Sequence, residues 1–315
     1  MGVGGSQLNV FHYRAYNLLI RSEVECPELL AADAAPGLVP DVVIHYGESP
    51  TFLPDSRARY DDCFIVPNEC LLLLDDGSRI WVRHGREMVV THPARRVGAE
   101  ARRCLLDLCF SMLLHQRRAL VLHGSAIETP RGVVTFVAPS GQGKSTLAMA
   151  FYDRGYCLVA DDICAVVLDE HRRPLASPSY PRVKLWEEMV LHSGRETQHL
   201  RRVRPDEEKY GVPVRQRFAR RATVLDTVYL LQVSETQPLT LQPCAGAERL
   251  AVLLNHTYRQ NELRASGMAP HHFRLATEVA HRIRVCRVRR PATPFLLDAL
   301  VTLLEQDFAR GAREK

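Results

Sequence analysis

The chain has 315 residues, of which 46% are hydrophobic and 24% are charged, a composition typical of soluble globular proteins. Its formal net charge of +5 is too small to indicate a nucleic-acid-binding protein, and no apolar run approaches the roughly 20 residues of a membrane-spanning helix. We therefore expect neither nucleic acid nor a membrane among its partners.

The nine cysteines are scattered along the chain and include no Cys-x-x-Cys pair. An odd number without a regular framework favours reduced thiols, and the sequence shows no secretory signal, so we predict a cytoplasmic protein. The first six residues fit the pattern for N-myristoylation. A flexible glycine-rich start is the preferred interpretation of that stretch.

Short strand-like runs and turn clusters alternate in the first half of the chain. Strands are predicted at residues 41–45, 70–74 and 79–83. Residues 99–116 carry apolar side chains at helical spacings and predict a helix. Because no catalytic constellation occurs here, we interpret residues 1–117 as a small α/β accessory domain.

The second half alternates predicted strands with predicted helices. The strands are expected at residues 119–122, 133–137, 156–160, 163–168, 227–233 and 283–289. The helices are expected at residues 147–154, 247–258, 271–281 and 294–309. This pattern predicts an α/β catalytic domain over residues 118–315.

A glycine-rich loop follows the strand at 133–137. Residues 138–145 read Ala-Pro-Ser-Gly-Gln-Gly-Lys-Ser and match the P-loop pattern except at the first position. Gly141 and Gly143 let the backbone N–H groups point inward at phosphates, Lys144 supplies a positive charge, and Ser145 offers a hydroxyl to Mg²⁺. We predict ATP and Mg²⁺ as cofactors, with these nucleotide-binding residues: Pro139, Ser140, Gly141, Gln142, Gly143, Lys144, Ser145 and Thr146.

Two adjacent carboxylates, Asp161 and Asp162, end the apolar strand at 156–160. Only one helix and one strand separate them from the loop, so both should lie beside it. Paired carboxylates next to a nucleotide can hold Mg²⁺ and take the proton from an attacking hydroxyl. The alternative is a helix cap or a turn. His123 lies at the end of the predicted strand that precedes the strand at 133–137. A histidine there can be a structural residue or part of the active site.

Four motifs occur in the order and at the spacing of a known family: His123-Gly-Ser, the loop from Pro139 to Ser145, Arg154-Gly-Tyr and Val159-Ala-Asp-Asp. In these the chain resembles the HPr kinase/phosphorylase family, and especially the kinases of lasso-peptide biosynthesis clusters. The resemblance covers residues 118–315, and more weakly residues 16–22. The chain departs from the bifunctional enzymes at Ala138 and lacks their later glycine-rich loop.

The resemblance implies a P-loop kinase domain of the HPr kinase type, with a mixed sheet and flanking helices, that phosphorylates a serine hydroxyl. It implies that Lys144 binds phosphate and that Ser145 binds Mg²⁺. Asp162 would be the base that activates the acceptor, Asp161 would help at the metal, and His123 would line the site. The division of roles between the two aspartates is open.

Three further cations are candidate substrate contacts. Arg182 and Lys184 lie in the segment 179–186, where the acceptor should approach, although this segment could equally anchor the start of a helix. Arg259 lies in a stretch that resembles the lasso-cluster kinases. Basic residues also crowd between 195 and 221, which indicates either a solvated face or a landing surface for an acidic substrate or nucleotide phosphates.

The leading interpretation is therefore an ATP-dependent kinase whose partner is a peptide or protein bearing a serine. The specific substrate would be the C-terminal serine of a lasso-peptide precursor. The alternatives are a kinase of a small hydroxylated metabolite and a non-catalytic ATP-binding regulator. The sequence leaves open whether the chain forms a homo-oligomer.

Overall fold

The structure, a computed structural model, describes residues 9–33, 37–56, 58–60, 63–235, 238–292 and 296–310. The chain divides into two compact units. The first comprises residues 1–117 and 261–268, and the second comprises residues 118–260 and 269–315. Both combine helices and strands, so the chain is a mixed α/β protein. The myristoylation pattern lies outside the described residues.

The first unit contains a nine-stranded mixed sheet of order β3-β1-β2-β4-β9-β8-β7-β6-β5. Its strands are β1 (Phe11–Ala15), β2 (Leu18–Ser22), β3 (Leu30–Ala31), β4 (Val42–Tyr46), β5 (Ala58–Tyr60), β6 (Cys63–Val66), β7 (Glu69–Leu73), β8 (Arg79–Arg83) and β9 (Glu87–Thr91). Helices α1 (Ala99–Cys104) and α2 (Phe110–Gln116) are joined by the π-helical turn η1 (Leu105–Cys109), and α6 (Gln260–Ala265) comes later in the chain.

The three strands predicted in this unit are confirmed as β4, β7 and β8. In β8 the buried Ile80 and Val82 alternate with more exposed residues, which is the period of a strand with one buried face. The predicted helix at 99–116 is also confirmed, although a π-helical turn interrupts it. The sheet is larger than the sequence indicated.

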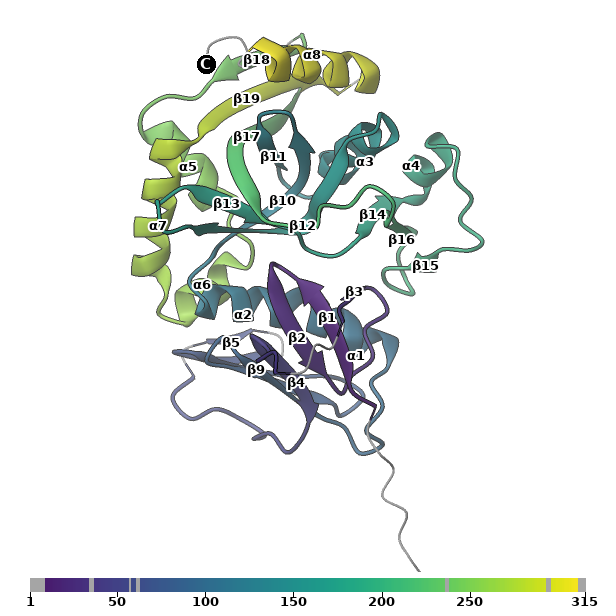
Figure 1. Cartoon of the computed structure of the whole chain (residues 1–315), viewed down its shortest axis with the longest axis vertical. Coiled ribbons are helices and arrows are strands. Elements are labelled where there is room, and N and C mark those ends of the chain that lie inside the picture. Colours follow the sequence, from purple (N-terminus) through teal and green to yellow (C-terminus); the bar gives the residue numbers. More distant parts are fainter. Residues whose placement is uncertain are drawn as a thin grey trace, which may run out of the picture. The chain divides into compact units, whose positions relative to one another are not determined.

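The second unit is built on a seven-stranded sheet of order β11-β10-β12-β13-β17-β19-β18, in which β11 also pairs with β17. Five strands therefore close into a ring, and β19 and β18 extend from it (Figure 1). Strands β11, β17 and β19 run parallel. The bounds are β10 (Leu120–Thr129), β11 (Gly132–Val137), β12 (Cys157–Leu168), β13 (Pro174–Ser177), β17 (Thr223–Ser234), β18 (Thr240–Pro243) and β19 (Arg284–Pro291).

Helices lie on both sides of this sheet. Figure 1 shows α5 and α7 to one side of β17 and α3 to the other, with α8 beside β19. The bounds are α3 (Lys144–Asp153), α4 (Glu187–His192), α5 (Ala247–Asn255), α7 (Ala269–Arg282) and α8 (Leu297–Arg310). A small antiparallel sheet adds β14 (Arg182–Trp186), β16 (Lys209–Pro213) and β15 (Arg201–Arg202). Within the described residues, no helix is long and apolar enough to cross a membrane.

Strand β12 differs from its prediction in one respect that matters for the site. The two predicted strands at 156–160 and 163–168 are one continuous strand, so Asp161 and Asp162 lie inside it. Asp162 has a φ of 71°, in the left-handed region that residues other than glycine rarely adopt. The other predicted strands and helices of this unit are present with shifted bounds. Residues 294 and 295 of the predicted closing helix lie outside the described residues.

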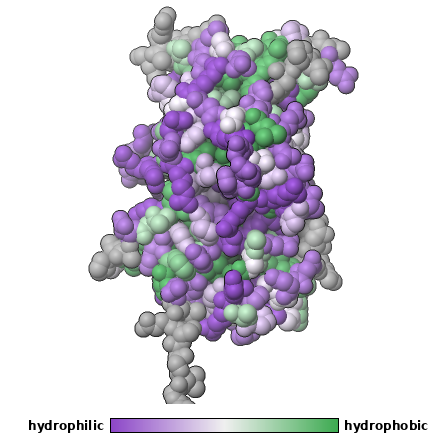
Figure 2. Space-filling model, turned by 90° about the vertical axis from the view of Figure 1, so that its right-hand side faces the viewer, coloured by the Kyte–Doolittle hydropathy of each residue, from purple (hydrophilic) through white to green (hydrophobic). Residues whose placement is uncertain are grey.

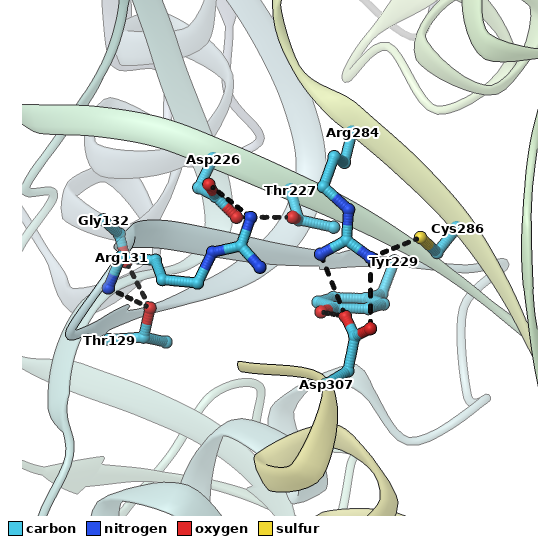
Figure 3. A network of polar contacts seen from close by, with 9 residues as sticks. All are labelled: Thr129, Arg131, Gly132, Asp226, Thr227, Tyr229, Arg284, Cys286 and Asp307. Carbon is cyan, nitrogen blue, oxygen red and sulfur yellow. Dashed lines mark hydrogen bonds and ion pairs between the residues drawn. The ribbon is translucent and has the colours of Figure 1, made fainter. Parts of the chain in front are cut away.

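Helix α8 is joined to the sheet by a partly buried polar network (Figure 3). Asp307 accepts a hydrogen bond from the hydroxyl of the fully buried Tyr229 (2.6 Å) and two from the Arg284 guanidinium (both 3.1 Å). Burial alone would raise the pKa of Asp307, but these hydrogen bonds outweigh it and lower that pKa. The carboxylate thus joins α8 to β17 and β19.

Replacing Asp307→Ala should lower the free energy of unfolding by about 2 kcal/mol, because Tyr229 and Arg284 lose a charged acceptor. A carboxyl whose folded pKa is depressed stabilises the fold above its unfolded pKa of about 3.9 and loses that effect as the pH falls. The difference from the parent should therefore shrink below about pH 4. Urea denaturation at several pH values measures both quantities.

The matched control is Asp298→Ala on the same helix. The Asp298 side chain is 97% exposed although it pairs with Arg154, so its loss should cost less than about 1 kcal/mol. Equal losses of unfolding free energy in the two variants would mean that the network around Asp307 does not hold α8.

Candidate functional site

The loop at 138–143 connects β11 to α3, the strand–loop–helix context that a P-loop requires. Gly141 and Gly143 have φ values of 80° and 90°, and Gly143 is the residue that caps the start of α3. Both positions favour glycine, because a side chain is strained at such angles. The backbone therefore curls as an anion-binding loop does, with the N-terminus of a ten-residue helix beneath it.

The lysine of the loop is held across it. Lys144 is only 7% exposed, and its Nζ donates hydrogen bonds to the carbonyl oxygens of Ala138 (2.9 Å) and Pro139 (3.2 Å). Burial lowers the pKa of Lys144, while the negative charges of Asp162 and Asp161 oppose that effect. A phosphate would offer this ammonium group a charged acceptor in place of neutral carbonyls.

Asp161 lies beneath the loop and is only 4% exposed. Its Oδ1 accepts hydrogen bonds from the hydroxyls of Ser145 (2.7 Å) and Ser125 (2.6 Å). Its Oδ2 accepts one from the backbone N–H of Lys184 (2.8 Å). These donors come from α3, β10 and β14, so one carboxylate connects three elements next to the hydroxyl expected to meet a metal.

Asp162 meets different partners from those of its neighbour. One oxygen accepts a hydrogen bond from Nζ of Lys184 (2.5 Å), and the other lies 3.3 Å from Nε2 of His123. Burial alone would raise the pKa of Asp162, but the charge of Lys184 and the contact with His123 hold it well below its usual range. Asp162 is therefore ionised at neutral pH and lines the pocket beside the loop.

His123 is fixed by its backbone and by its ring. Its N–H donates to the carbonyl oxygen of His256 (2.7 Å), and its ring meets the ring of Tyr258 edge-on at 5.4 Å. Leu122 and Thr257 form a bridge beside these contacts, so residues 256–258 run along β10. The next residue, Gly124, has no room for a side chain, because a Cβ there would lie 2.7 Å from the carbonyl oxygen of Phe136.

A pocket of about 400 Å³ opens in front of these residues. It is lined by His123, Ser140, Gly141, Gly143, Lys144, Ser145, Thr146, Asp162, Lys184, Leu185, Trp186, Glu188, Met189, Lys209, Tyr258 and Arg290. Opposite the loop, Trp186 is 48% exposed, and Nζ of Lys209 lies 5.7 Å from the centre of its ring. The pocket therefore pairs a phosphate loop with a wall that carries an aromatic side chain and a cation.

The residues proposed from the sequence divide into two groups. His123, Lys144, Ser145, Asp162 and Lys184 meet at this pocket, with Asp161 directly beneath it. Four others do not line the pocket. Two are the loop residues Pro139 and Gln142. The other two are arginines: the guanidinium of Arg182 lies over the ring of Tyr180, and that of Arg259 over the ring of Tyr258.

Sequence reasoning missed several residues of the site. Ser125 stands in the His-Gly-Ser motif, so its place in the motif could have identified it. The other missed residues, Trp186, Lys209, Tyr258 and Arg290, come from four separate segments that only the tertiary structure brings together. Lys209 belongs to the basic stretch noted in the sequence, but no local pattern singles it out.

The basic stretch at 195–221 is partly neutralised. Arg195 pairs with Asp153, Arg202 with Glu208 (3.4 Å), and Arg204 with Glu207 (3.3 Å). Figure 2, which faces the side of α4 and β15 in Figure 1, shows a mainly hydrophilic surface with scattered hydrophobic residues. Exposed pairs of this kind contribute little to stability, so they are consistent with a solvated face.

The oxygen atoms at Ser145 and Asp161 are the donors that Mg²⁺ prefers. They lie 2.7 Å apart next to the loop, which fits a magnesium ion held mainly by the phosphates of a nucleotide. In the part of the chain that the structure describes, no group of three or more His, Cys, Asp or Glu side chains is placed to hold a metal by itself.

Comparison by sequence finds no matching family and no matching curated protein. Among solved structures, the Hpr(Ser) kinase/phosphatase from Coxiella burnetii is similar to this chain, with 12% sequence identity and a TM-score of 0.36. The alignment covers 62% of this chain and 93% of that one. A likeness this weak carries no argument about fold or activity, so the chemistry of this chain rests on its own residues.

Proposed function

We propose that the chain is an ATP-dependent kinase that transfers the γ-phosphate to a serine hydroxyl of a peptide. The observation that supports the proposal best is that the two adjacent aspartates beside the loop contact different partners. Asp161 accepts from the loop hydroxyl of Ser145, while the ionised Asp162 lines the pocket in which an acceptor can approach. Phosphoryl transfer requires a metal ligand and a group that activates the acceptor. Asp161 is placed for the first role and Asp162 for the second.

The donor half of the reaction belongs to the loop. Its backbone N–H groups and Lys144 would hold the phosphates, and Ser145 and Asp161 would hold a magnesium ion, which would supply positive charge next to the β- and γ-phosphates. The hydrogen bonds from Ser125 and Ser145 to Asp161 hold β10 and α3 beside β12 at this point.

The acceptor half belongs to Asp162 and Lys184. The serine oxygen bonds to the γ-phosphorus, the bond from that phosphorus to the β–γ bridging oxygen breaks, ADP leaves, and the serine proton passes to Asp162. A carboxylate with a depressed pKa is a weak base, but the transition state is loose, so orienting the hydroxyl matters more than basicity. Lys184 can compensate charge on the incoming phosphoryl group.

The pocket wall supports a peptide as the acceptor. The half-exposed Trp186 offers apolar contact area, and Lys209 beside it offers a cation for a carboxylate. The C-terminal serine of a lasso-peptide precursor is the first substrate to test, because the motifs of the chain resemble those of the lasso-cluster kinases.

The direct experiment incubates the purified protein with ATP, Mg²⁺ and a precursor peptide and measures phosphate addition by mass spectrometry. A peptide whose C-terminal serine is replaced by alanine is the control and should gain no phosphate. ATP binding without transfer to any hydroxylated peptide would instead favour a non-catalytic regulator.

The variant Lys144→Met should weaken binding of Mg·ATP by about tenfold or more and abolish transfer, because it removes the charge that faces the phosphates. Isothermal titration calorimetry measures the affinity, and thermal unfolding checks the fold. Lys209→Met is the matched control, since it removes a lysine of the same pocket that lies over Trp186 instead. Similar losses of ATP affinity in both variants would argue against a specific role for Lys144.

The two aspartates should separate in a magnesium titration. Asp162→Asn keeps the side-chain shape but loses the charged acceptor that orients the serine hydroxyl and takes its proton, so turnover should fall by roughly 10²–10⁴-fold at every Mg²⁺ concentration. Asp161→Asn should raise the Mg²⁺ concentration that gives half-maximal turnover. If excess Mg²⁺ restores both variants, neither aspartate is the base, and His123 becomes the candidate.

A further inference from the structure

A second cavity, of about 680 Å³, lies on another flank of the same loop. It is lined by Pro139, Gln142, Leu230, Gln232, Val233, Ser234, Glu248, Ala251, Val252, Asn255, His256, Arg287 and Arg289. It touches the loop at Pro139 and Gln142, whereas the other predicted loop residues line the first pocket. The loop therefore separates two cavities.

The sheet explains where this cavity lies. Strands β11, β17 and β19 are parallel, and ligands of such sheets bind outside the carboxyl ends of the strands. Val137, the last residue of β11, pairs with Leu230, so residues 231–234 of β17 continue beyond the start of the loop. The cavity occupies this carboxyl edge, with α5 as its other wall.

Strand pairing accounts for four of the side chains that line it. Gln232 pairs with Arg289 and Leu230 with Arg287, and paired residues share one face of a sheet. All four line the cavity. The next residue of β19, Arg290, lines the first pocket instead. Two successive arginines of β19 thus line different cavities: Arg289 lines the second cavity and Arg290 the first pocket.

The lining suits an uncharged heterocycle with hydrogen-bonding edges. Apolar surface comes from Leu230 and Val252, and amide groups come from Gln232 and Asn255. Burial and the nearby charges of Lys144 and His123 lower the pKa of His256 to about 4, so its imidazole is neutral at pH 7. A neutral imidazole can both donate and accept a hydrogen bond.

Charge in the cavity is limited. Arg287 pairs with Glu248 inside the lining, and Arg289 donates to the amide oxygen of Gln242 (3.1 Å). The lining thus combines apolar side chains with neutral amides and an imidazole, in a volume typical of a small-molecule site. The first pocket, which Lys144 and Asp162 line, has about 400 Å³ and must hold the γ-phosphate and the acceptor.

We propose that this second cavity binds the purine nucleoside of the phosphate donor, so that base and acceptor occupy different flanks of the loop. The inference rests on the proposed function, since it assumes that the loop binds a nucleoside triphosphate. Gln232, Asn255 and His256 contact the base and ribose, and the triphosphate passes over the loop from one cavity to the other.

The test compares two ligands that share their phosphates. ATP and inorganic tripolyphosphate, each with Mg²⁺, are titrated calorimetrically into the parent protein and its variants. The parent should bind ATP at least about tenfold more tightly than tripolyphosphate, because only ATP fills the cavity. Ala251→Phe places a ring in the cavity and should reduce ATP affinity to that of tripolyphosphate without changing tripolyphosphate affinity.

Two further variants control for damage to the fold. Ala247→Phe adds the same ring one turn earlier on α5, at an exposed position that does not line the cavity, and should bind both ligands like the parent. Asn255→Ala adds no bulk and should lose ATP affinity about three- to tenfold while keeping tripolyphosphate affinity.

The outcomes separate this inference from the proposed function. Equal affinities of the parent for ATP and tripolyphosphate would overturn the nucleoside cavity while leaving the phosphate loop intact. Parent-like ATP affinity in Ala251→Phe would do the same. A parent protein that binds neither ligand would overturn the proposed kinase function itself.

Discussion

The second unit depends on a buried carboxylate that must be satisfied from three directions. Asp161 accepts hydrogen bonds from Ser125, Ser145 and the backbone of Lys184, and an ionised carboxylate buried without such donors would be strongly unfavourable. The donors can be present together only if β10, α3 and β14 are correctly placed. The contacts that stabilise this region therefore also place the hydroxyl of Ser145.

Lys184 extends this constraint to the second carboxylate. Its backbone N–H donates to Asp161, and its ammonium group donates to Asp162. Asp161 and Asp162 are neighbours in one continuous strand, so their side chains point to opposite sides and meet different partners, and Asp162 has a left-handed φ. Strained backbone of this kind concentrates at functional sites, where the surrounding structure holds it.

Local patterns in the sequence predicted the parts of the site that depend on local structure. The loop, its lysine and the two aspartates follow from spacing and residue type, and so do most strands and helices of the second unit. Partners supplied by strand pairing were not predictable in this way. Arg182 and Lys184 lie two residues apart on β14, yet only Lys184 reaches the pocket, because Arg182 stacks on Tyr180.

The register of the long strands was likewise not predictable. No local pattern in residues 284–291 tells that Arg289 and Arg290 enter different cavities, since that depends on the pairing of β19 with β17. In the first unit the prediction missed β1, β2, β3, β5, β6 and β9, whose pairing with neighbouring strands no local pattern shows.

The segment from Asn255 to Tyr258 faces both cavities: Asn255 and His256 line one, and Tyr258 lines the other. Its backbone is tied to β10 through His123 and Val121, so it forms a short, fixed partition. To the extent that a ligand on one side displaces this partition, the affinity on the other side changes with it. Thermodynamic linkage makes such an effect mutual, so donor and acceptor would alter each other's affinity by the same factor.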